Sequence, residues 1–552
     1  MRWVARIATL VYGILILVPF ILAFDRLIWA AGTTPAEWFS RLDTYYLSKG
    51  AIEFSFEQAL VSVLFTTAIG LPIAWQLGRY RWPGQNIIRA VLTMPFVMPA
   101  IIAAMGFLSL SGPQFFDIRA DPSTYFWTLI IAHAWFNMAL VIRFTEPVLS
   151  TLDKDYEDQL KLLPGGRSFL ARIRNLWFPV LRGPIAAAMT MTFVFSFTSF
   201  ALIRWLTPLD ENLETLMSGV GSSAGIQGYN VFANEIVLAA SLIQFAVMLV
   251  SLWLLSFLQQ RNKNTISQTS VSFAQGTNPK GWLIVAPGLI FAVSPLITVI
   301  ISSLRIPTRE SGEIYYHWGT DAWSSAFAGS YSNSSVGDAL LNSIGYASIT
   351  MLIALPLGWI LAKHIHNLEL AGSRWARVVD VLTMLPFAIS AVMIGLGVSL
   401  GIILIDKWLI RDFWIIPVIP HLMLTTPFVV RIMLNAQRNF DPAYVETGKV
   451  LGLSRPQIFY KIELPLLRPS ILVSAVFTVA MSLGEFGASW IVARFGSWDT
   501  LPVLIDQLRS KPGFDPLIHP TAAAAATVLM ITTFIIFVAL EKFRGKDDGG
   551  MF

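Results

Sequence analysis

Long apolar runs alternate with short polar stretches along most of this chain. A helix needs about 20 mostly apolar residues to cross the hydrocarbon core of a bilayer, and twelve segments reach that length. Six lie before a polar stretch at 259–280 and six lie after it. The expected spans cover residues 4–24, 56–78, 87–110, 126–149, 184–206, 233–258, 281–304, 339–363, 377–405, 412–435, 468–492 and 520–541. The pattern predicts an all-α polytopic membrane protein.

Composition supports a membrane location and excludes several kinds of chemistry. Hydrophobic residues make up 55% of the chain and charged residues 13%, whereas soluble domains average about 25% charged. The chain has no cysteine, which excludes disulfides, thiolate metal sites and cysteine nucleophiles. The net charge of +5 comes from basic residues scattered between the spans. Membrane lipid is therefore the expected surrounding, and no nucleic-acid partner is expected.

Lysine and arginine set the expected orientation of the spans. Loops rich in these residues stay in the cytoplasm. If the amino terminus is cytoplasmic and the sides alternate, the larger share of the Lys and Arg side chains falls on the cytoplasmic side. We therefore expect a multi-pass protein of the cytoplasmic (inner) membrane of a prokaryote, with both termini cytoplasmic.

The two halves of the chain resemble each other in sequence. The pairs of similar segments occur in the same order and nearly constant spacing: 68–79 with 352–363, 91–94 with 381–384, 153–163 with 441–451, and 178–185 with 464–471. Because six expected spans separate the members of each pair, both copies run in the same membrane direction. This is a parallel repeat, related by an axis along the membrane normal.

The repeat also predicts the domain boundaries. The first six-helix repeat is expected at 1–258, with a core at 54–258, and the second at 281–552, with a core at 338–541. The polar stretch 259–280 is rich in Asn, Gln, Ser and Thr and is expected to be a cytoplasmic linker.

The stretch ETGKVLGLSRPQIFYKIELP at 446–465 does not resemble a simple connection. Asp441 is expected to cap a short helix that Gly452 ends, and Ser454 to cap a second short helix that Pro465 limits. Both helices would carry apolar faces, and Gly448 would leave a bare spot where another surface could approach closely. The pattern is typical of a docking element on the cytoplasmic side.

This stretch resembles the cytoplasmic "EAA" coupling loop of type I ABC importer permeases. The family pattern has a Glu, a small pair, a Gly six residues after the Glu, an Ile ten residues later, and then Leu-Pro after one further residue. The corresponding residues here are Glu446, Gly448, Gly452, Ile462, Leu464 and Pro465. A weaker copy in the first half consists of Asp158, Gly166, Leu176 and Pro179, with two extra residues before the glycine.

The resemblance implies the partners. In that family the coupling loop inserts into a cleft of an ATPase subunit and transmits its motion to the spans. We expect two copies of an ABC ATPase and an extracytoplasmic substrate-binding protein. The chain lacks a Gly-x-x-x-x-Gly-Lys-Ser/Thr phosphate loop, so the ATPase partner would use ATP and Mg²⁺. This chain is expected to bind no cofactor and to be a transport subunit without catalytic residues.

Further segments narrow the expected substrate. Residues 54–64, 79–84, 132–137 and 482–487 look most like fused thiamine permeases. Fused ferric-iron permeases are close behind and remain the alternative. Oxyanion permeases for sulfate or molybdate carry a similar Gly-acid-aromatic-Gly run but are usually two separate subunits.

Glu485 is the acidic residue expected deepest in a span. An acidic residue at mid-membrane costs about 2.5–3.5 kcal/mol, so Glu485 would face a substrate pathway or form a hydrogen bond that locks the two halves together. The candidate pathway residues are Glu485, Ser482, Phe486, Ser199 and Phe200. The aromatic rings could stack on an aromatic cation such as thiamine, or could simply pack between helices.

The two repeat-related histidines, His133 and His421, are expected to hydrogen-bond to neighbouring helices. No metal site is expected, because no carboxylate cluster accompanies them in the sequence. A secondary transporter would more often show broken helices with membrane-embedded ion ligands. An embedded enzyme would need a convergent set of polar residues within the spans.

Overall fold

The computed structural model forms two compact units, which are described separately. Unit 1 contains Met1–Arg41, Met217–Ser241 and Trp323–Asp548, and unit 2 contains Leu42–Leu216, Leu242–Ala322 and Gly549–Phe552. The structure describes residues 2–45, 48–118, 121–163, 168–221, 232–263, 276, 278–310, 313–406, 408–494, 496 and 498–543. Most of the expected linker 259–280 therefore lies outside the described residues.

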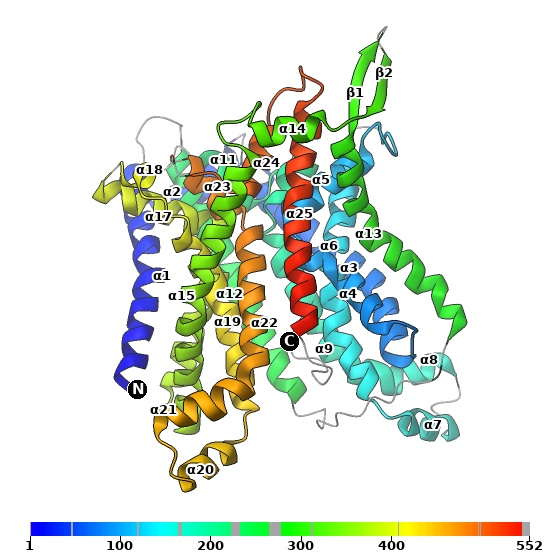
Figure 1. Cartoon of the computed structure of the whole chain (residues 1–552), viewed down its shortest axis with the longest axis vertical. Helices are drawn as coiled ribbons and strands as arrows, with labels where there is room; N and C mark the ends of the chain where they lie inside the picture. The colour runs from blue at the N-terminus through cyan, green and yellow to red at the C-terminus, as the bar shows by residue number, and fades with distance from the viewer. Residues whose placement is uncertain are drawn as a thin grey trace. The chain divides into compact units, whose positions relative to one another are not determined.

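Unit 1 is helical in its described part (Figure 1). Its elements are α1 (Arg2–Ala31), α15 (Val336–Leu370), α16 (Trp375–Ala388), α17 (Ala391–Ile405), α18 (Leu409–Asp412), α19 (Val418–Arg438), α20 (Pro442–Val450), α21 (Arg455–Ile458), the π-helical turn η4 (Phe459–Glu463), α22 (Leu464–Gly484), α23 (Gly487–Arg494), α24 (Leu501–Arg509) and α25 (Ile518–Phe543).

Unit 2 repeats much of this order. Its elements are α3 (Ala51–Arg79), α4 (Gln85–Val97), α5 (Ala100–Ser111), α6 (Pro122–Thr151), α7 (Lys154–Leu162), α8 (Phe169–Arg172), the π-helical turn η2 (Ile173–Trp177), α9 (Phe178–Phe197), α10 (Ala201–Leu206), the 3-10 turn η3 (Pro279–Gly281), α13 (Trp282–Leu304), β1 (Arg305–Glu310) and β2 (Glu313–Trp318). The residues of four helices are divided between the units: α2 (Pro35–Thr44), α11 (Leu213–Gly221), α12 (Ala233–Lys263) and α14 (Asp321–Ala328).

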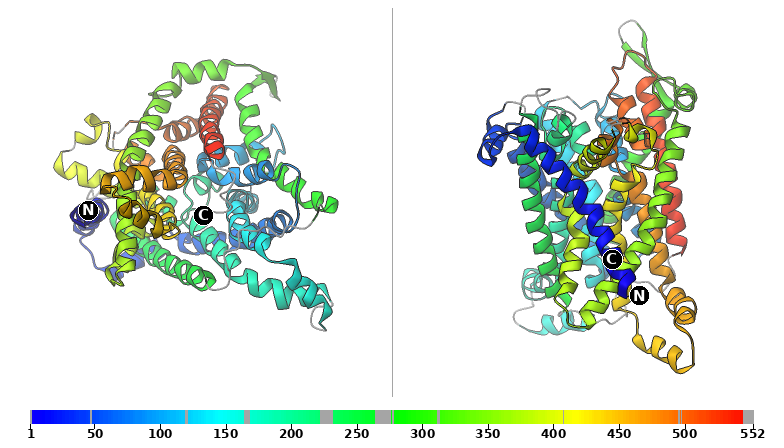
Figure 2. Two further views of the ribbon diagram at one scale, coloured as in Figure 1. Left: turned by 60° about the horizontal axis from the view of Figure 1, so that its bottom comes forward. Right: turned by 90° about the vertical axis from the view of Figure 1, so that its left-hand side faces the viewer.

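Each unit includes the first long helix of the opposite half of the sequence, α1 in unit 1 and α13 in unit 2. In unit 1, α1 packs against α15 and α17, as the right-hand view of Figure 2 shows. The contact is close: a Cβ on Gly397 would lie 2.8 Å from the carbonyl oxygen of Pro19. In unit 2, α13 packs against α3, α4 and α5, and a Cβ on Gly106 would lie 2.6 Å from the Pro295 carbonyl oxygen. The two compact units thus differ in composition from the two expected repeats, 1–258 and 281–552. The boundaries of the repeats remain a prediction.

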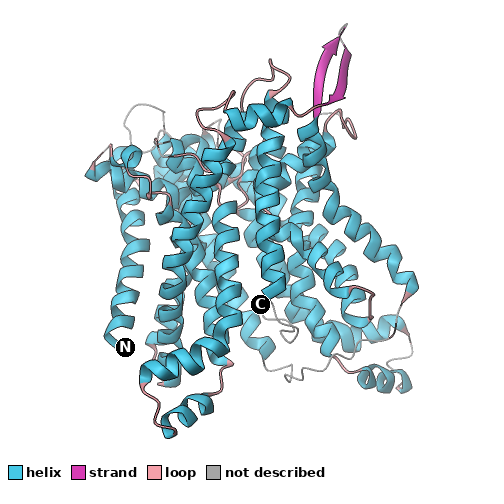
Figure 3. Cartoon of the chain, viewed as in Figure 1, coloured by secondary structure: helices cyan, strands magenta, loops and turns pink. Residues whose placement is uncertain are grey.

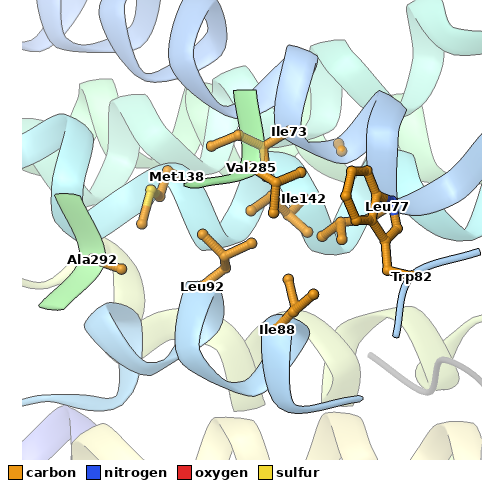
Figure 4. Close-up of a cluster of buried hydrophobic side chains, with 10 residues drawn as sticks. Ile73, Leu77, Trp82, Ile88, Leu92, Met138, Ile142, Val285 and Ala292 are labelled. Atoms are coloured by element: carbon orange, nitrogen blue, oxygen red, sulfur yellow. The ribbon is translucent and has the colours of Figure 1, made fainter. Parts of the chain in front are cut away.

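An apolar cluster shows why α13 belongs to unit 2 (Figure 4). Val285 and Ala292 of α13 are buried among side chains of α3, α4 and α6. The cluster consists of Ile73, Ala74, Leu77, Trp82, Ile88, Leu92, Met138, Ile142, Val285 and Ala292. Without a hydrophobic driving force between helices in lipid, such close side-chain packing is a main source of helix association.

The expected number of spans is confirmed, but two of them are bent. Among the described residues, 10 helices are long and apolar enough to cross a membrane, and the count reaches 12 if each bent pair is one span. The expected spans 87–110 and 377–405 are these pairs. Helices α4 and α5 meet at 98°, and α16 and α17 meet at 94°. Each of these two expected spans therefore consists of two helices instead of one.

Local backbone preferences explain the bends. Pro99 follows Met98, and a residue before proline is driven out of the helical region; Met98 accordingly has φ −71° and ψ 140°. In the other pair, Ser390 leaves the helix at φ −62° and ψ 148°, and its hydroxyl accepts a hydrogen bond from the Met393 amide. Ser390 is thus the N-cap of α17. Apolar length alone does not reveal such a break.

Two other expected spans end early. The span expected at 184–206 stops with α9 at Phe197, and the one expected at 468–492 stops with α22 at Gly484. Both begin earlier than expected, because η2 and η4 join them to the short helices that precede them. The helical runs that can span a membrane are Leu170–Phe197 and Arg455–Gly484.

The strands β1 and β2 form an antiparallel hairpin that the apolar pattern did not predict (Figure 3). The pairing runs from Arg305 opposite Trp318 to Glu310 opposite Glu313. The hairpin continues directly from the end of α13 in unit 2. It lies between the expected spans 281–304 and 339–363.

Helix α3 approaches α6 closely through a glycine. A Cβ on Gly78 would lie 2.6 Å from the Cβ of Leu149 and 3.0 Å from the carbonyl oxygen of Glu146. Both atoms belong to α6 and neither is the mobile end of a side chain. The approach of the two helices therefore depends on the missing side chain.

We expect Gly78→Ala to destabilise the protein by about 1–3 kcal/mol, because an added methyl group overpacks this contact. The measurement is the apparent melting temperature of the purified full chain in detergent, monitored by size-exclusion chromatography after heating. Gly13→Ala is the matched control, since its Cβ would meet the nearest side chain at an ordinary 3.5 Å. Equal melting temperatures for both variants would contradict the proposed close contact.

Candidate functional site

The second coupling loop begins with a well-defined short helix, α20. The Asp441 carboxylate accepts a hydrogen bond from the Ala443 amide at 2.9 Å, and Pro442 occupies the first turn. Gly452 ends the helix with φ +77°. The Leu453 amide donates to the Gly448 carbonyl at 3.0 Å, which together with the Gly452 amide makes a Schellman ending. The predicted start and stop of this helix are confirmed.

The second helix of the loop does not end where the sequence predicted. The Ser454 amide donates to Gln457 Oε1 at 2.9 Å and starts α21. This helix then continues through η4 into α22, so Pro465 lies inside a continuous helical run. The Leu464 amide donates to the Phe459 carbonyl, five residues earlier. This wider turn relieves the contact that a proline ring otherwise makes with the carbonyl four residues back.

The packing of the loop buries Gly448 and exposes apolar side chains. A Cβ on Gly448 would lie 2.6 Å from Ile462 Cδ1, so the surface that approaches this glycine belongs to the loop itself. The expectation of a bare spot for a foreign surface was therefore wrong. Glu446 is exposed, and Val450 and Leu451 are 87% and 73% exposed. These side chains give the loop an uncovered face with both charge and apolar area.

The first coupling loop has the same plan in part. The Asp153 carboxylate accepts from the Asp155 amide at 3.0 Å and starts α7. Asp158 forms an ion pair with Lys161 at 2.8 Å on the surface of this helix. Gly166 lies outside the described residues. Pro179 follows η2, just as Pro465 follows η4, so the π-helical turn is a feature of both repeats.

Glu485 occupies the break between α22 and α23 in unit 1. Its carboxylate accepts hydrogen bonds from the Ala488 amide at 2.7 Å, the Ser489 amide at 2.8 Å and the Ser489 hydroxyl. His421 Nε2 of α19 lies 3.5 Å from Glu485 Oε2. The Glu485 side chain is only 7% exposed. The carboxylate therefore satisfies two amides of the first turn of α23 from one residue before its N-cap, where the helix dipole favours negative charge.

His421 connects this break to a neighbouring helix. Its Nδ1 lies 2.6 Å from the Ser482 hydroxyl of α22, and its Nε2 lies 2.9 Å from the Ser489 hydroxyl of α23. The prediction that His421 hydrogen-bonds to a neighbouring helix is confirmed. Glu485, Ser482 and His421 thus form one buried polar cluster within the second repeat, and Phe486 is buried next to it in the chain. The described hydrogen bonds of Glu485 lie within this repeat.

The corresponding break in unit 2 has different chemistry. Asn212 Nδ2 donates to the carbonyl oxygens of Phe197 and Ser199 at 3.1 Å and 3.0 Å. A side-chain amide therefore satisfies the carbonyls at the end of α9, whereas in unit 1 a carboxylate satisfies amides at the start of α23. Phe200 is buried at this break. His133 lies 3.0 Å from the Ser62 hydroxyl of α3, as expected of a hydrogen bond to a neighbouring helix.

The candidate pathway residues divide into two sets. Ser199 and Phe200 lie in unit 2, and Glu485, Ser482 and Phe486 lie in unit 1. Sequence reasoning missed Ser489 and Asn212. Ser489 stands four residues after Glu485, one more than the usual spacing of a capping contact, so no local pattern indicated it. Asn212 precedes a helical segment, and its Oδ1 accepts from the Thr215 amide, a local signal of an N-cap.

We expect Glu485→Ala to lower stability by about 1–3 kcal/mol, because it leaves the buried amides of Ala488 and Ser489 without their acceptor. Glu485→Gln retains one acceptor oxygen and should cost less. The thermal stability of the detergent-purified full chain measures both. Ser199→Ala, at the related position of the first repeat, is the control. This substitution leaves the hydrogen bond between Asn212 and the carbonyl of residue 199 in place. A Glu485→Ala variant as stable as this control would refute the capping role.

Comparisons with known proteins extend over both repeats. The sequence pattern of the family described as binding-protein-dependent transport system inner membrane component matches residues 66–264 and again 354–543. Two copies of one family pattern confirm the internal repeat and the expected all-α, fused, two-repeat permease fold of type I ABC importers.

Individual relatives cover most of the chain or one part of it. The thiamine transport system permease protein ThiP of Haemophilus influenzae is 25% identical over 528 residues, 90% of this chain and 89% of that protein. ThiP of Escherichia coli strain K12 is 23% identical over 552 residues, 95% of this chain and 94% of that protein. The sulfate transport system permease protein CysT of Salmonella typhimurium is 31% identical over 157 residues, 27% of this chain and 55% of that protein.

The family assignment follows from the extent of the match. The two matched segments together span more than half of the sequence, and each contains one coupling loop and one broken membrane helix. This chain therefore belongs to the family of binding-protein-dependent transport system inner membrane components.

Proposed function

We propose that this chain is the transmembrane permease subunit of an ATP-driven importer for thiamine. The observation that carries the proposal is similarity to thiamine permeases over nine-tenths of the chain, through both repeats. The similarity to a sulfate permease covers 27% of the chain and supports only the permease fold. Ferric iron, the alternative from the sequence, is kept as an outcome of the test.

The family implies a binding protein and an ABC ATPase as partners. We propose that two copies of the ATPase dock on the coupling loops, one on α7 and one on α20. The exposed Glu446 and Val450 of α20, and Leu451 directly after it, supply charge and apolar surface for such a contact. The Lys and Arg bias of the loops supports a cytoplasmic position for these helices and for both termini.

The permease itself is proposed to hold no cofactor and to make no covalent change. The partner ATPase uses ATP and Mg²⁺, and the binding protein delivers thiamine to the opposite side of the membrane. ATP binding and hydrolysis then move the coupling helices, and the continuous helical runs through η2 and η4 carry this motion into the spans. No interruption separates α21 from α22, so a displacement of the loop displaces the membrane helix.

The proposed pathway residues are Glu485, Ser482 and Phe486 in one repeat and Ser199 and Phe200 in the other. Thiamine is a cationic aromatic molecule, which a carboxylate and aromatic rings can bind. Phe200 and Phe486 are only 7% and 4% exposed. A stacking role therefore requires these rings to become accessible in another state of the transport cycle.

Uptake of labelled thiamine tests the proposal. Cells that lack their own thiamine importer would express this chain with its ATPase and binding protein. We expect accumulation of thiamine that disappears when ATP is depleted or the ATPase is omitted. A parallel assay with labelled ferric iron is the control for substrate. Uptake of iron without thiamine would replace the thiamine assignment with the alternative, and uptake without the ATPase would contradict an ATP-driven importer.

The left-handed residue of the coupling loop gives a second test. Gly452→Val places a β-branched residue at φ +77°, which costs roughly 1–2 kcal/mol and distorts the end of α20. We expect ATP-dependent uptake to fall strongly while the chain remains in the membrane. Gly452→Asn is the matched control, because Asn tolerates this conformation. The loop would not be the coupling element if both variants transported like the unsubstituted chain.

A further inference from the structure

Arg79, the last residue of α3, joins several elements of unit 2 around the first coupling helix. The guanidinium is 2% exposed. Its NH1 nitrogen donates to the Leu152 carbonyl at the end of α6 at 2.9 Å, and its NH2 nitrogen donates to Glu157 Oε2 of α7 at 3.0 Å. Its central carbon lies 4.7 Å from the ring centre of Trp177 in η2. One side chain thus contacts α6, α7 and η2.

Glu157 is the acceptor that ties α7 to this cluster. Besides Arg79, it lies 3.9 Å from Arg172 Nε of α8 and 3.8 Å from Lys161 Nζ of its own helix. The Glu157 side chain is 16% exposed. Dissolved salt weakens the attraction within such a partly buried ion pair much less than within an exposed one. The ion pair with Arg79 therefore holds α7 on the side that faces the membrane helices.

The second repeat places its charges differently. Lys363 corresponds to Arg79 in the repeat, since 68–79 aligns with 352–363. Its Nζ pairs with Glu463 of η4 at 2.6 Å. In the alignment of the two repeats, Glu463 corresponds to Trp177, because each residue directly precedes the matched segments 464–471 and 178–185. Val445 of α20 corresponds to Glu157 of α7. The acidic partner of the basic residue therefore lies on the coupling helix in the first repeat and on the π-helical turn in the second.

The second coupling helix is instead packed through a glycine. Gly448 of α20 lies against Ile462 and Ile458, and a side chain there would have to displace the end of Ile462. Such a contact is apolar and depends on shape. The first coupling helix is fastened by a buried charge and the second by close apolar packing.

We propose that Arg79 is a positioning residue that fastens the first coupling helix to α3 and α6, so that the two coupling loops transmit motion through different physical links. The proposal rests on the proposed function, in which α7 and α20 are the helices that dock the ATPase. The planar fork of arginine serves the carbonyl and the carboxylate together, and lysine cannot reproduce this geometry. Loss of Glu157 would leave the buried guanidinium without its counter-charge.

Spin labels test the fastening without any need for transport. The chain has no cysteine, so single labels at Gln159→Cys in α7 and at the repeat-related Thr447→Cys in α20 report each helix in the full chain in lipid nanodiscs. We expect Arg79→Lys and Glu157→Val, which introduce the residues of the second repeat, to raise the mobility of the label at 159. Lys363→Gln is the matched control and should leave the label at 447 unchanged.

Two results would overturn the proposal. One is an unchanged spectrum at 159 in both Arg79→Lys and Glu157→Val. The other is an equal rise at 159 and 447 in the matched variants, which would indicate general loosening of the protein. Glu157→Gln, which retains shape and removes charge, serves in place of Glu157→Val if that variant is not monodisperse, with the same expected rise in mobility.

A transport assay tests the consequence for coupling. In proteoliposomes with the ATPase and binding protein, we expect Glu157→Val to raise the ATP hydrolysed per thiamine imported several-fold, while the ATPase still co-purifies with the permease. An unchanged ratio would overturn the coupling role of Arg79. If the unsubstituted chain imports no thiamine, the substrate assignment fails, and the label mobility still decides whether Arg79 fastens α7.

Discussion

The interior of a bilayer offers no water to the peptide backbone, so every interruption of a membrane helix needs a protein group to satisfy the freed amides and carbonyls. Three interruptions among the described residues follow that constraint through a side chain. The Ser390 hydroxyl accepts a hydrogen bond from one amide at the start of α17, and the Glu485 carboxylate accepts hydrogen bonds from two amides at the start of α23. The Asn212 side chain donates hydrogen bonds to two carbonyls at the end of α9. These polar side chains allow the spans to bend and break where a transport subunit needs irregular backbone.

The two repeats have helix breaks and coupling helices at corresponding places in the chain, but the side chains that stabilise them differ. The break after α22 is stabilised by an anion on a helix start, and the break after α9 by an amide on a helix end. The coupling helices differ in the same way, with Glu157 on α7 and Val445 at the corresponding place on α20. In a fused chain each copy occurs once, so each can adapt to its own neighbour. Two identical subunits could not diverge like this.

Small residues set how closely the helices approach within each unit. Gly78 brings α3 against α6, Gly106 brings α5 against α13, and Gly397 brings α17 against α1. Dispersion contacts need such short distances, because lipid competes equally well for apolar surface. The same principle shapes the second coupling loop, where Gly448 admits Ile462. Glycines therefore permit close packing both between the membrane helices and within the loop that contains α20.

The sequence by itself determined the number of spans, the repeat, and the start and stop of α20. Each of these is written in a continuous stretch of chain: a span in its apolar run, and the ends of α20 in Asp441 and Gly452, which each contact residues close to them in the sequence. Only the tertiary structure decided the bends between α4 and α5 and between α16 and α17, the continuity of η4 into α22 past Pro465, and the packing of α1 in unit 1 and α13 in unit 2. It also decided that Glu485 caps a helix and that Arg79 reaches Glu157. These features depend on groups that meet across large sequence separations, and a local pattern of apolar and polar residues carries no record of such meetings.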